Sequence, residues 1–485
     1  MYRCKNCWHG VDTEDLNSIF QCPICGVERE MFEEIKITDK YKGIAIDKKN
    51  KAITRIIEKC INCGRCNNVC HNLVGIKYEI EQLRHPICVN CGTCILNCPT
   101  GAIVPKYAFK KVFNLIKNKN KTVIISVSPA VRVALGEEFG LDYGKNVEGK
   151  MVTALKKIGF DYVFDTTFGA DLTVIEEANE LIKRLDKPQK LPQFSSCCPS
   201  WVKYLEIYHP ELIKHLSTCK SPIGMQGSIV KTYFAKEKKL KPQNIIHVAL
   251  TPCTAKKAEI ALNESNTSKK YYKKPSLVDT DYVITTSELG LMLRENNIDF
   301  ANLSSSGFDN LLNKGSGSGL LFGNIGGVTN AVINTTYHLL TNEDPHKLDI
   351  TFEKAKKYDD VLITKIVIKN KTIAIAVVNG LIAAEKIIQN NVYQQYDFIE
   401  VMNCQSGCIG GGGQPLGPIN KQNIIIEARK KSLKAADKAD IISYSYQNPD
   451  IIRIYNNFLE KPGSSLSEKL LHTTYKDKSK LLKNK

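Results

Sequence analysis

The chain has 485 residues, of which 43% are hydrophobic and 24% charged, an ordinary composition for a globular protein with room for several domains. Its net charge of +17 suggests nucleic-acid binding, but no basic helix with interleaved aromatic residues is present, so we predict no nucleic-acid partner. No apolar run reaches membrane-spanning length and no secretory signal is visible, so we expect a cytoplasmic protein without a membrane partner.

The 18 cysteines are the most informative feature of the sequence. Without a secretory signal, closely spaced cysteines more often bind metals than form disulfides. The first set combines a Cys-x2-Cys pair with a Cys-Pro-x-Cys-Gly turn, which offers four sulfur ligands to one tetrahedral metal. Zinc ribbons share this spacing, so the metal is either iron or zinc. The four cysteines are Cys4, Cys7, Cys22 and Cys25.

Residues 1–36 resemble the short rubredoxin domains of rubrerythrins, both in the Cys-Pro-x-Cys-Gly turn and in the Met31-Phe32 pair that follows. Trp8 departs from the pattern, because rubredoxins usually carry glycine after the first cysteine pair. The resemblance favours one iron over zinc. Aromatic residues such as Phe20 and Phe32 stand where a small metal-nucleated domain needs its core.

Residues 37–106 contain two copies of a Cys-x2-Cys-x2-Cys-x3-Cys run. In such paired runs, three closely spaced thiolates bind one cubane and the fourth cysteine binds the other. The spacing therefore predicts an α+β ferredoxin domain with two [4Fe–4S] clusters. The predicted ligands are Cys60, Cys63, Cys66 and Cys98 for one cluster, and Cys88, Cys91, Cys94 and Cys70 for the other.

From residue 107 to residue 485, apolar runs of strand length alternate with segments of helical periodicity. This alternation predicts an α/β catalytic domain with parallel sheets in two lobes. A Gly-Ser-Gly-Ser-Gly run at 315–319 follows no predicted strand, so we expect no dinucleotide site there. The predicted strands cover 121–127, 162–164, 245–250, 282–285, 373–378 and 398–402, and the predicted helices cover 152–158 and 172–184.

Six cysteines remain outside these two sets. Cys404 and Cys408 are one helical turn apart and precede four consecutive glycines, which are costly to order unless something bulky lies against their backbone. Pro199 restricts Cys198 to extended conformations. The adjacent side chains of Cys197 and Cys198 should therefore point in different directions, as one free thiol and one ligand.

Three ordered segments around these cysteines resemble the signatures of the iron-only (FeFe) hydrogenases. They are SSCCPSW at 195–201, TPCTAKKAE at 251–259 and EVMNCQSGCIGGGGQP at 400–415. The similarity also covers 168–172 and 470–473, and it extends from about residue 36 to the end. It implies an enzyme that interconverts H2 with two protons and two electrons.

The resemblance implies an H-cluster, which joins a [4Fe–4S] cubane to a two-iron unit carrying CO, cyanide and a bridging dithiolate amine. Maturation proteins must build and insert the two-iron unit. By the same resemblance, Lys256 can donate a charge-assisted hydrogen bond to cyanide. The implied cubane ligands are Cys198, Cys253, Cys404 and Cys408, with Cys408 bridging to the two-iron unit; backbone amides around Ser128, Pro129 and Ala130 are further donors, and Phe322 and Met402 pack around the unit.

Protons reach a buried metal site only through a relay of titratable or hydroxyl groups. Glu177, Glu180 and Arg184 share one face of a predicted helix, which by itself is typical of a solvated surface. Members of the family, however, run their relay through the positions that match Cys197, Glu177, Ser217, Glu180 and Arg184. Cys219 matches no signature, and we expect it to be a buried thiol.

Two positions depart from the better-known family members: Thr251 replaces the usual Met, and Ile223 stands where Gln is common. We expect these changes to affect rate and catalytic bias rather than cofactor binding. A hydrogen sensor with low turnover and an iron–sulfur assembly factor of the same fold are the alternative functions. Cys197 and Lys256 argue against the assembly factor, because both serve the two-iron unit. The retained relay residues argue against the sensor, because sensors of this family tend to lose them.

The expected partners are H2, protons, an acidic ferredoxin or other electron carrier, and the maturation proteins. The positive charge suits electrostatic steering of an acidic carrier. A rubredoxin iron is usually a better electron acceptor than a low-potential cubane, so the rubredoxin-like domain favours hydrogen uptake.

Overall fold

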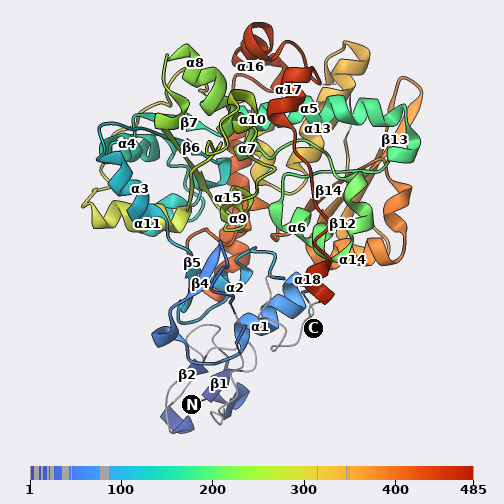
Figure 1. Ribbon diagram of the computed structural model, residues 1–485. Helices are drawn as coiled ribbons and strands as arrows, with labels where there is room; N and C mark the ends of the chain where they lie inside the picture. The colour runs from blue at the N-terminus through green and yellow to red at the C-terminus, as the bar shows by residue number, and fades with distance from the viewer. Residues whose placement is uncertain are drawn as a thin grey trace.

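The computed structural model describes residues 2–4, 10–11, 15–18, 21, 27–34, 43–44, 46–76, 87–313, 315–345, 348 and 350–483. Figure 1 shows the N-terminal segments in blue at one end of the molecule, next to a wider α/β body that contains the rest of the chain. Within the described ranges, no helix has both the length and the apolar character needed to cross a bilayer.

Three short strands form an antiparallel sheet near the N-terminus, in the order β2-β1-β3. They are β1 (Tyr2–Cys4), β2 (Gly10–Val11) and β3 (Phe32–Glu34). Phe32 is buried, as its predicted place in the core requires. Phe20, Cys7, Cys22 and Cys25 lie outside the described residues, so the predicted four-sulfur site stays a prediction.

The next part of the chain shows an internal structural repeat. Helices α1 (Arg65–Val69) and α2 (Thr93–Leu96) each begin after a glycine with positive φ, Gly64 at 74° and Gly92 at 77°. Glycine adopts this conformation without strain, so each cysteine run can turn sharply from loop to helix. The strands β4 (Ile53–Arg55) and β5 (Ile103–Pro105) pair antiparallel beside the two helices.

The first sheet of the α/β body is entirely parallel, in the order β10-β9-β6-β7. Every residue of its inner strand β9 is buried, because helices cover both faces of the sheet. Helices α3, α4 and α11 pack on one face, and α5 and α7 pack on the other. The strands are β6 (Thr122–Val127), β7 (Tyr162–Asp165), β9 (Ile245–Thr251) and β10 (Tyr282–Thr285), and the helices are α3 (Phe109–Ile116), α4 (Glu148–Ile158), α5 (Thr167–Leu185), α7 (Pro222–Ile229) and α11 (Thr286–Glu295).

The second sheet is mixed, so the prediction of parallel sheets is wrong for its outer part. Its order is β11-β12-β13-β14-β8, in which β11 and β13 each pair antiparallel with β12, while β14 pairs parallel with both β13 and β8. The strands β12 and β13 are joined by Lys369 and Asn370 alone, both with positive φ, and such a two-residue turn forms an antiparallel hairpin. The strands are β8 (Gln193–Phe194), β11 (Glu353–Ala355), β12 (Tyr358–Ile368), β13 (Lys371–Asn379) and β14 (Phe398–Met402).

Helix α5 contributes to the cores of both lobes. Phe168, Leu172 and Ile175 pack with the first sheet, whereas Val174 and Ala178 pack with the second sheet and α13 (Gly327–Thr341). Fourteen of its 19 residues are buried, among them several acidic ones, so its polar groups are placed inside the protein rather than on a solvated face.

The Gly-Ser-Gly-Ser-Gly run packs directly against the start of α5. A Cβ atom at Gly315 would lie 2.3 Å from the carbonyl carbon of Thr167, and one at Gly319 would lie 2.7 Å from its oxygen. The glycines are therefore needed for close contact between backbones. The run leads into α12 (Gly317–Leu320), and the other helices are α6 (Pro199–Tyr208), α8 (Ala235–Glu237), α9 (Lys256–Glu259), α10 (Ser268–Tyr272), α14 (Leu381–Gln389), α15 (Gln422–Lys438), α16 (Pro449–Ile454), α17 (Ser465–Leu471) and α18 (Lys480–Lys483).

Candidate functional site

Four cysteines from three separate segments gather between the two lobes. Cys198 precedes α6 in an extended conformation, Cys253 follows β9, and Cys404 and Cys408 follow β14. Burial raises the pKa of Cys404 well above its usual value, and the neighbouring thiols of Cys253, Cys198 and Cys408 raise it further. Four free thiols that influence one another in this way form a donor set that fits a four-iron cubane.

A cavity of about 60 Å³ lies beside Cys408. Its walls are mostly apolar, but they include the thiol of Cys197 and the ammonium group of Lys256. A mostly apolar space that is lined by one cation and by the sulfurs of Cys197, Cys253 and Cys408 fits an iron unit with anionic ligands. The lining includes all the residues predicted for that unit, namely Ser128, Pro129, Ala130, Phe322 and Met402, together with Thr251 and Ile223.

Lys256 is buried at the start of α9 and has two polar partners. Its Nζ donates to the carbonyl oxygen of Cys197 at 3.0 Å and forms an ion pair with Oε2 of Glu259 at 2.7 Å. Burial lowers the pKa of Lys256, but the Glu259 carboxylate outweighs this and raises it above its usual value. Lys256 is therefore a fixed positive charge in the cavity wall.

Cys197 and Glu177 form the inner end of a line of polar groups. Burial raises the pKa of the Cys197 thiol well above its usual value, and the nearby carboxyl of Glu177 adds to the rise. Neither carboxyl oxygen of Glu177 has a hydrogen-bond partner within the described part of the chain. Burial raises the pKa of Glu177 to about 8, with Glu180 adding to the effect, so the group is mostly protonated at neutral pH.

Ser217, Glu180 and Arg184 continue the line toward the surface. The Ser217 hydroxyl donates to Oε2 of Glu180 at 2.8 Å, and the Arg184 guanidinium pairs with Oε1 of Glu180 at 2.7 Å. Arg184 also donates to the carbonyl oxygen of Leu216 at 2.7 Å, which anchors it to the loop that carries Ser217. The five residues expected to form a relay thus lie near one another, in the order Cys197, Glu177, Ser217, Glu180 and Arg184.

A short C-terminal segment holds this loop in place. The backbone N–H of Thr473 donates to the carbonyl oxygen of Thr218 at 2.8 Å, and the Tyr475 hydroxyl donates to the carbonyl oxygen of Ser217 at 2.6 Å.

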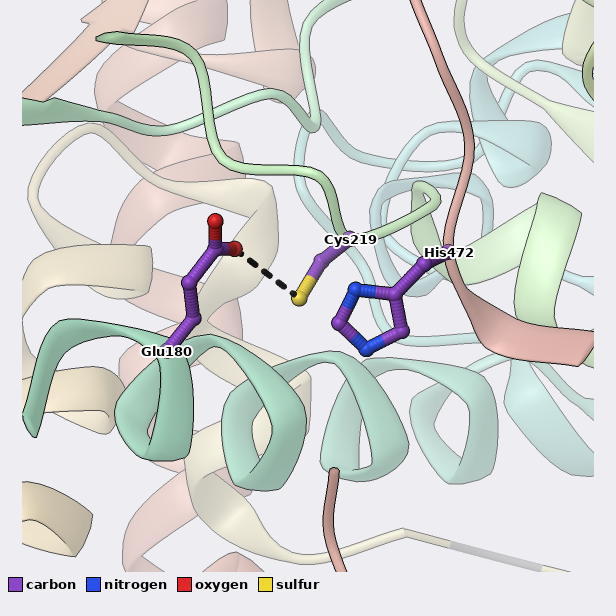
Figure 2. Close-up of side chains that lie close together, drawn as sticks. All are labelled: Glu180, Cys219 and His472. Atoms are coloured by element: carbon purple, nitrogen blue, oxygen red, sulfur yellow. Dashed lines mark hydrogen bonds between the residues drawn. The ribbon is translucent and has the colours of Figure 1, made fainter. Parts of the chain in front are cut away.

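Cys219 and His472 lie beside this line of polar groups, although the sequence analysis did not assign either residue to it. Cys219 is fully buried, as predicted, and its thiol donates to Oε2 of Glu180 at 3.7 Å. Figure 2 shows the carboxylate, this thiol and the His472 ring facing one another above α5. The position of Cys219 two residues after Ser217 was the available signal, whereas His472 is far away in the chain and gave none.

The cysteines of the two repeated runs also gather in two groups. Burial raises the pKa of Cys63, and the thiols of Cys66, Cys98 and Cys60 add to it. Burial also raises the pKa of Cys94 well above its usual value, with Cys91, Cys88 and Cys70 among its neighbours. In each group, three cysteines come from one run and the fourth comes from the other.

The second of these groups lies directly against the four-thiol site. A Cβ atom at Gly412 would lie 2.5 Å from the carbonyl oxygen of Cys91, so the two backbones touch with no side chain between them. Thr254 and Lys203 both bond to Asn90, at 2.7 Å each. Gly410, Gly411 and Gly412 therefore pack against backbone, and the contact at Gly412 brings two cysteine groups together, as an electron path requires.

Such a set of buried cysteine groups defines an iron–sulfur redox protein, and comparisons with known proteins narrow the class. The family "Iron only hydrogenase large subunit, C-terminal domain" matches residues 121–412, and "Iron hydrogenase small subunit" matches residues 423–478 of the same chain. The chain is 38% identical to the NADP-reducing hydrogenase subunit HndD of Solidesulfovibrio fructosivorans, over 89% of this chain and 75% of that protein. It is 34% identical to iron hydrogenase 1 of Clostridium pasteurianum, over 94% of this chain and 83% of that protein.

A solved [FeFe]-hydrogenase structure from Chlamydomonas reinhardtii matches with a TM-score of 0.67 and 33% identity, covering 76% of this chain and 98% of that one. A cytosolic Fe–S cluster assembly factor of Danio rerio is only 27% identical, over 79% of this chain and 95% of that protein, so the assembly alternative is not favoured. The chain belongs to the iron-only hydrogenase family. It is an oxidoreductase that interconverts H2 with protons and electrons at an H-cluster, and it carries iron–sulfur clusters.

Proposed function

We propose that Cys198, Cys253, Cys404 and Cys408 hold the cubane of the H-cluster, with Cys408 bridging to a two-iron unit in the adjoining cavity. The observation that carries this proposal is the position of that cavity beside the four thiols, lined by the predicted residues. When bound, the two-iron unit supplies the redox site at which H2 and protons interconvert. Lys256 and backbone amides near Ala130 serve as donors to its anionic ligands, while Phe322 and Met402 exclude water.

Cys197, Glu177, Ser217, Glu180 and Arg184 form the proton relay. Cys197 exchanges protons with the cavity, and Glu177 passes them between Cys197 and Ser217. This assignment is supported by a mostly protonated Glu177 whose electrostatic neighbours include Ser217 and Glu180 and which is itself a neighbour of Cys197. Glu180 accepts the Ser217 hydrogen bond, and Arg184 keeps its carboxylate oriented toward the surface.

Electrons travel through two [4Fe–4S] clusters. One takes Cys88, Cys91, Cys94 and Cys70 and lies next to the H-cluster cubane, and the other takes Cys60, Cys63, Cys66 and Cys98. The contact between Gly412 and Cys91 supports this order. An acidic ferredoxin or other carrier exchanges electrons with the outer cluster.

A single iron on Cys4, Cys7, Cys22 and Cys25 provides a further electron port, zinc being the alternative metal. Its expected high potential favours hydrogen uptake. An iron midpoint potential as low as that of the ferredoxin clusters would remove the reason for this direction. We place the enzyme in the cytoplasm, where thiols stay reduced and maturation proteins can supply the two-iron unit.

The first test is infrared spectroscopy on anaerobic enzyme loaded with the two-iron unit, before and after exposure to H2. Sharp CO and cyanide bands that shift with H2 are the expected result. Their absence in protein with intact cubanes contradicts the assignment of the cavity.

Replacing Cys197 by serine tests the start of the relay separately. We expect Cys197→Ser to keep the infrared bands but to lose nearly all turnover, at least 10²-fold, because a serine hydroxyl gives up its proton far less readily than a thiol. Full turnover with unchanged bands would show that protons take another route.

A further inference from the structure

Three metal-binding side chains meet at the surface end of the relay. The carboxylate of Glu180, the sulfur of Cys219 and the imidazole of His472 offer ligand atoms that all lie within 4.8 Å of one another (Figure 2). These residues come from α5, from the loop after Ser217 and from the C-terminal segment. Cysteine, histidine and carboxylate together are the ligands that zinc prefers in proteins.

The backbone holds two of the three side chains in register. Cys219 and His472 face each other across an antiparallel β-bridge, closed by hydrogen bonds of 2.8 Å from Lys220 to Leu471 and from Thr473 to Thr218. Residues directly opposite in an antiparallel pair project their side chains from the same face. The thiol and the imidazole therefore lie side by side without any rearrangement of the fold.

His472 is oriented in the way that metal-binding histidines usually are. Its Nε2 lies 3.2 Å from Oε2 of Glu176, a fully buried carboxylate that also accepts from Tyr455 at 2.6 Å and Gly463 at 2.9 Å. A carboxylate partner at Nε2 places the ring hydrogen there and leaves the lone pair on Nδ1. Nδ1 lies 2.7 Å from the Thr218 hydroxyl, which can rotate away from an incoming ion.

The cluster is open to solvent on one side. Glu180 and His472 line a surface cleft of about 990 Å³, whose rim carries lysines such as Lys183 and Lys469. Around the thiol, in contrast, the titratable neighbours are carboxyls: Glu180, which is ion-paired with Arg184, Glu176 and the mostly protonated Glu177. The floor of the cleft therefore offers carboxylate groups to a cation even though its rim is basic.

We propose that Glu180, Cys219 and His472 form a site for one Zn²⁺ ion or a similar divalent transition-metal ion. Binding replaces the thiol hydrogen of Cys219, which leaves as a proton to solvent, and water completes the tetrahedral shell. The bound ion occupies the Glu180 carboxylate and stops proton passage between Ser217 and the cleft. This block rests on the proposed relay, whereas binding of the ion does not.

Binding is tested on anaerobic holoenzyme with all iron sites filled, by measuring zinc retained per chain after dialysis against ZnCl2. We expect one more zinc in the wild type than in Cys219→Ala or His472→Gln, and Zn K-edge absorption with one Zn–S contact near 2.3 Å that Cys219→Ala lacks. His338→Gln, at a half-buried histidine on α13 outside the cluster, is the matched control and should bind like the wild type. Equal zinc in wild type and both site variants would overturn the site.

The block is tested by hydrogen evolution with a small reductant, with and without zinc. We expect saturating zinc to lower wild-type turnover at least tenfold, reversibly on adding a chelator, with unchanged iron–sulfur absorption. Cys219→Ala, compared with its own zinc-free rate, should resist inhibition by zinc, and Mg²⁺ should have no effect on either protein. Zinc that binds at the site but leaves wild-type turnover unchanged would overturn the block and count against Glu180 as a relay group, while leaving the site itself in place.

Discussion

Burial and a neighbouring carboxyl together give Glu177 the protonation behaviour that the proposed relay requires. Its carboxyl is completely buried, has no hydrogen-bond partner within the described ranges, and lies close to a second carboxyl. Both the loss of hydration and the negative charge of Glu180 disfavour the ionised form, which raises the pKa of Glu177 to about 8. A group with a pKa near the working pH can both give and take a proton.

We therefore expect turnover to depend on the protonation state of Glu177. Because its pKa is raised, the protonated donor dominates below about pH 8 and is lost above it, so hydrogen evolution should fall on the alkaline side with a midpoint near that value. Glu177→Gln, which cannot pass a proton, should lower turnover by roughly 10²–10⁴-fold and remove this pH dependence. The measurement is a pH–rate profile at constant driving force.

Glu177→Asp is the matching control variant, since it keeps the carboxyl group on a side chain that is shorter by one methylene. It should retain part of the activity and show an alkaline limb with a shifted midpoint. An unchanged profile in Glu177→Gln would exclude this residue from the relay.

The glycine run after Cys408 acts at the level of whole elements. Beside the contact of Gly412 with Cys91, a Cβ at Gly411 would lie 2.3 Å from the carbonyl oxygen of Pro252. The run thus lets three backbone segments meet where two cysteine groups adjoin.

Gly412→Ala should separate these groups. The added methyl must push the loop of Cys91 outward, so we expect electron exchange with a carrier to slow several-fold, because electron transfer weakens steeply with distance. Exchange of H2 with D2O, which needs no external electrons, should stay near the wild-type rate. Gly307→Ala, where a Cβ meets nothing within 4 Å, is the control and should leave both rates unchanged. Equal slowing of both reactions would indicate general damage instead.

Strands that are buried on both faces could be predicted from the sequence, because their continuous apolar runs leave few alternatives. The structure confirms the predicted ranges of β10 and β14 at both ends. The hairpin of β12 and β13 was missed because its Lys369-Asn370 turn lacks the glycine that usually marks such a connection. For α5, helical periodicity predicted the helix, but only the packing of two lobes around it shows why its glutamates are buried.

The candidate site likewise has parts that the sequence predicted and parts that it did not. Spacing alone predicted the two ferredoxin cysteine groups, since the repeat specifies which thiols can share a cluster. The H-cluster cysteines and the relay followed from family resemblance. Cys219 and His472 meet only because the C-terminal segment returns to the loop of Ser217, a contact between residues 253 positions apart that no local pattern records.

At the scale of the whole molecule, the net charge of +17 has a kinetic consequence. Long-range attraction should steer an acidic electron carrier to the protein, and salt should screen it as the Debye length shrinks from about 30 Å at 0.01 M to about 8 Å at 0.15 M. We expect the second-order rate of electron exchange with an acidic ferredoxin to fall about tenfold over this range. The rate of electron exchange with a neutral redox dye, measured in parallel, should change little. An equal dependence of the two rates on salt concentration would exclude steering.

The contact between Gly412 and the Cys91 loop also limits how freely the parts of this enzyme can be exchanged. In sequence, the predicted ferredoxin domain looks like an independent unit that could be replaced by another. In three dimensions, the loop of Cys91 packs against the main chain of the catalytic part, and its neighbour Asn90 is hydrogen-bonded by Thr254 and Lys203. A domain taken from another protein would need a loop whose backbone fits against Gly412 in the same way. The contact between the Cys91 loop and the glycine run therefore constrains domain exchange in such a protein. Chimeras are best designed with both of these segments taken from one parent.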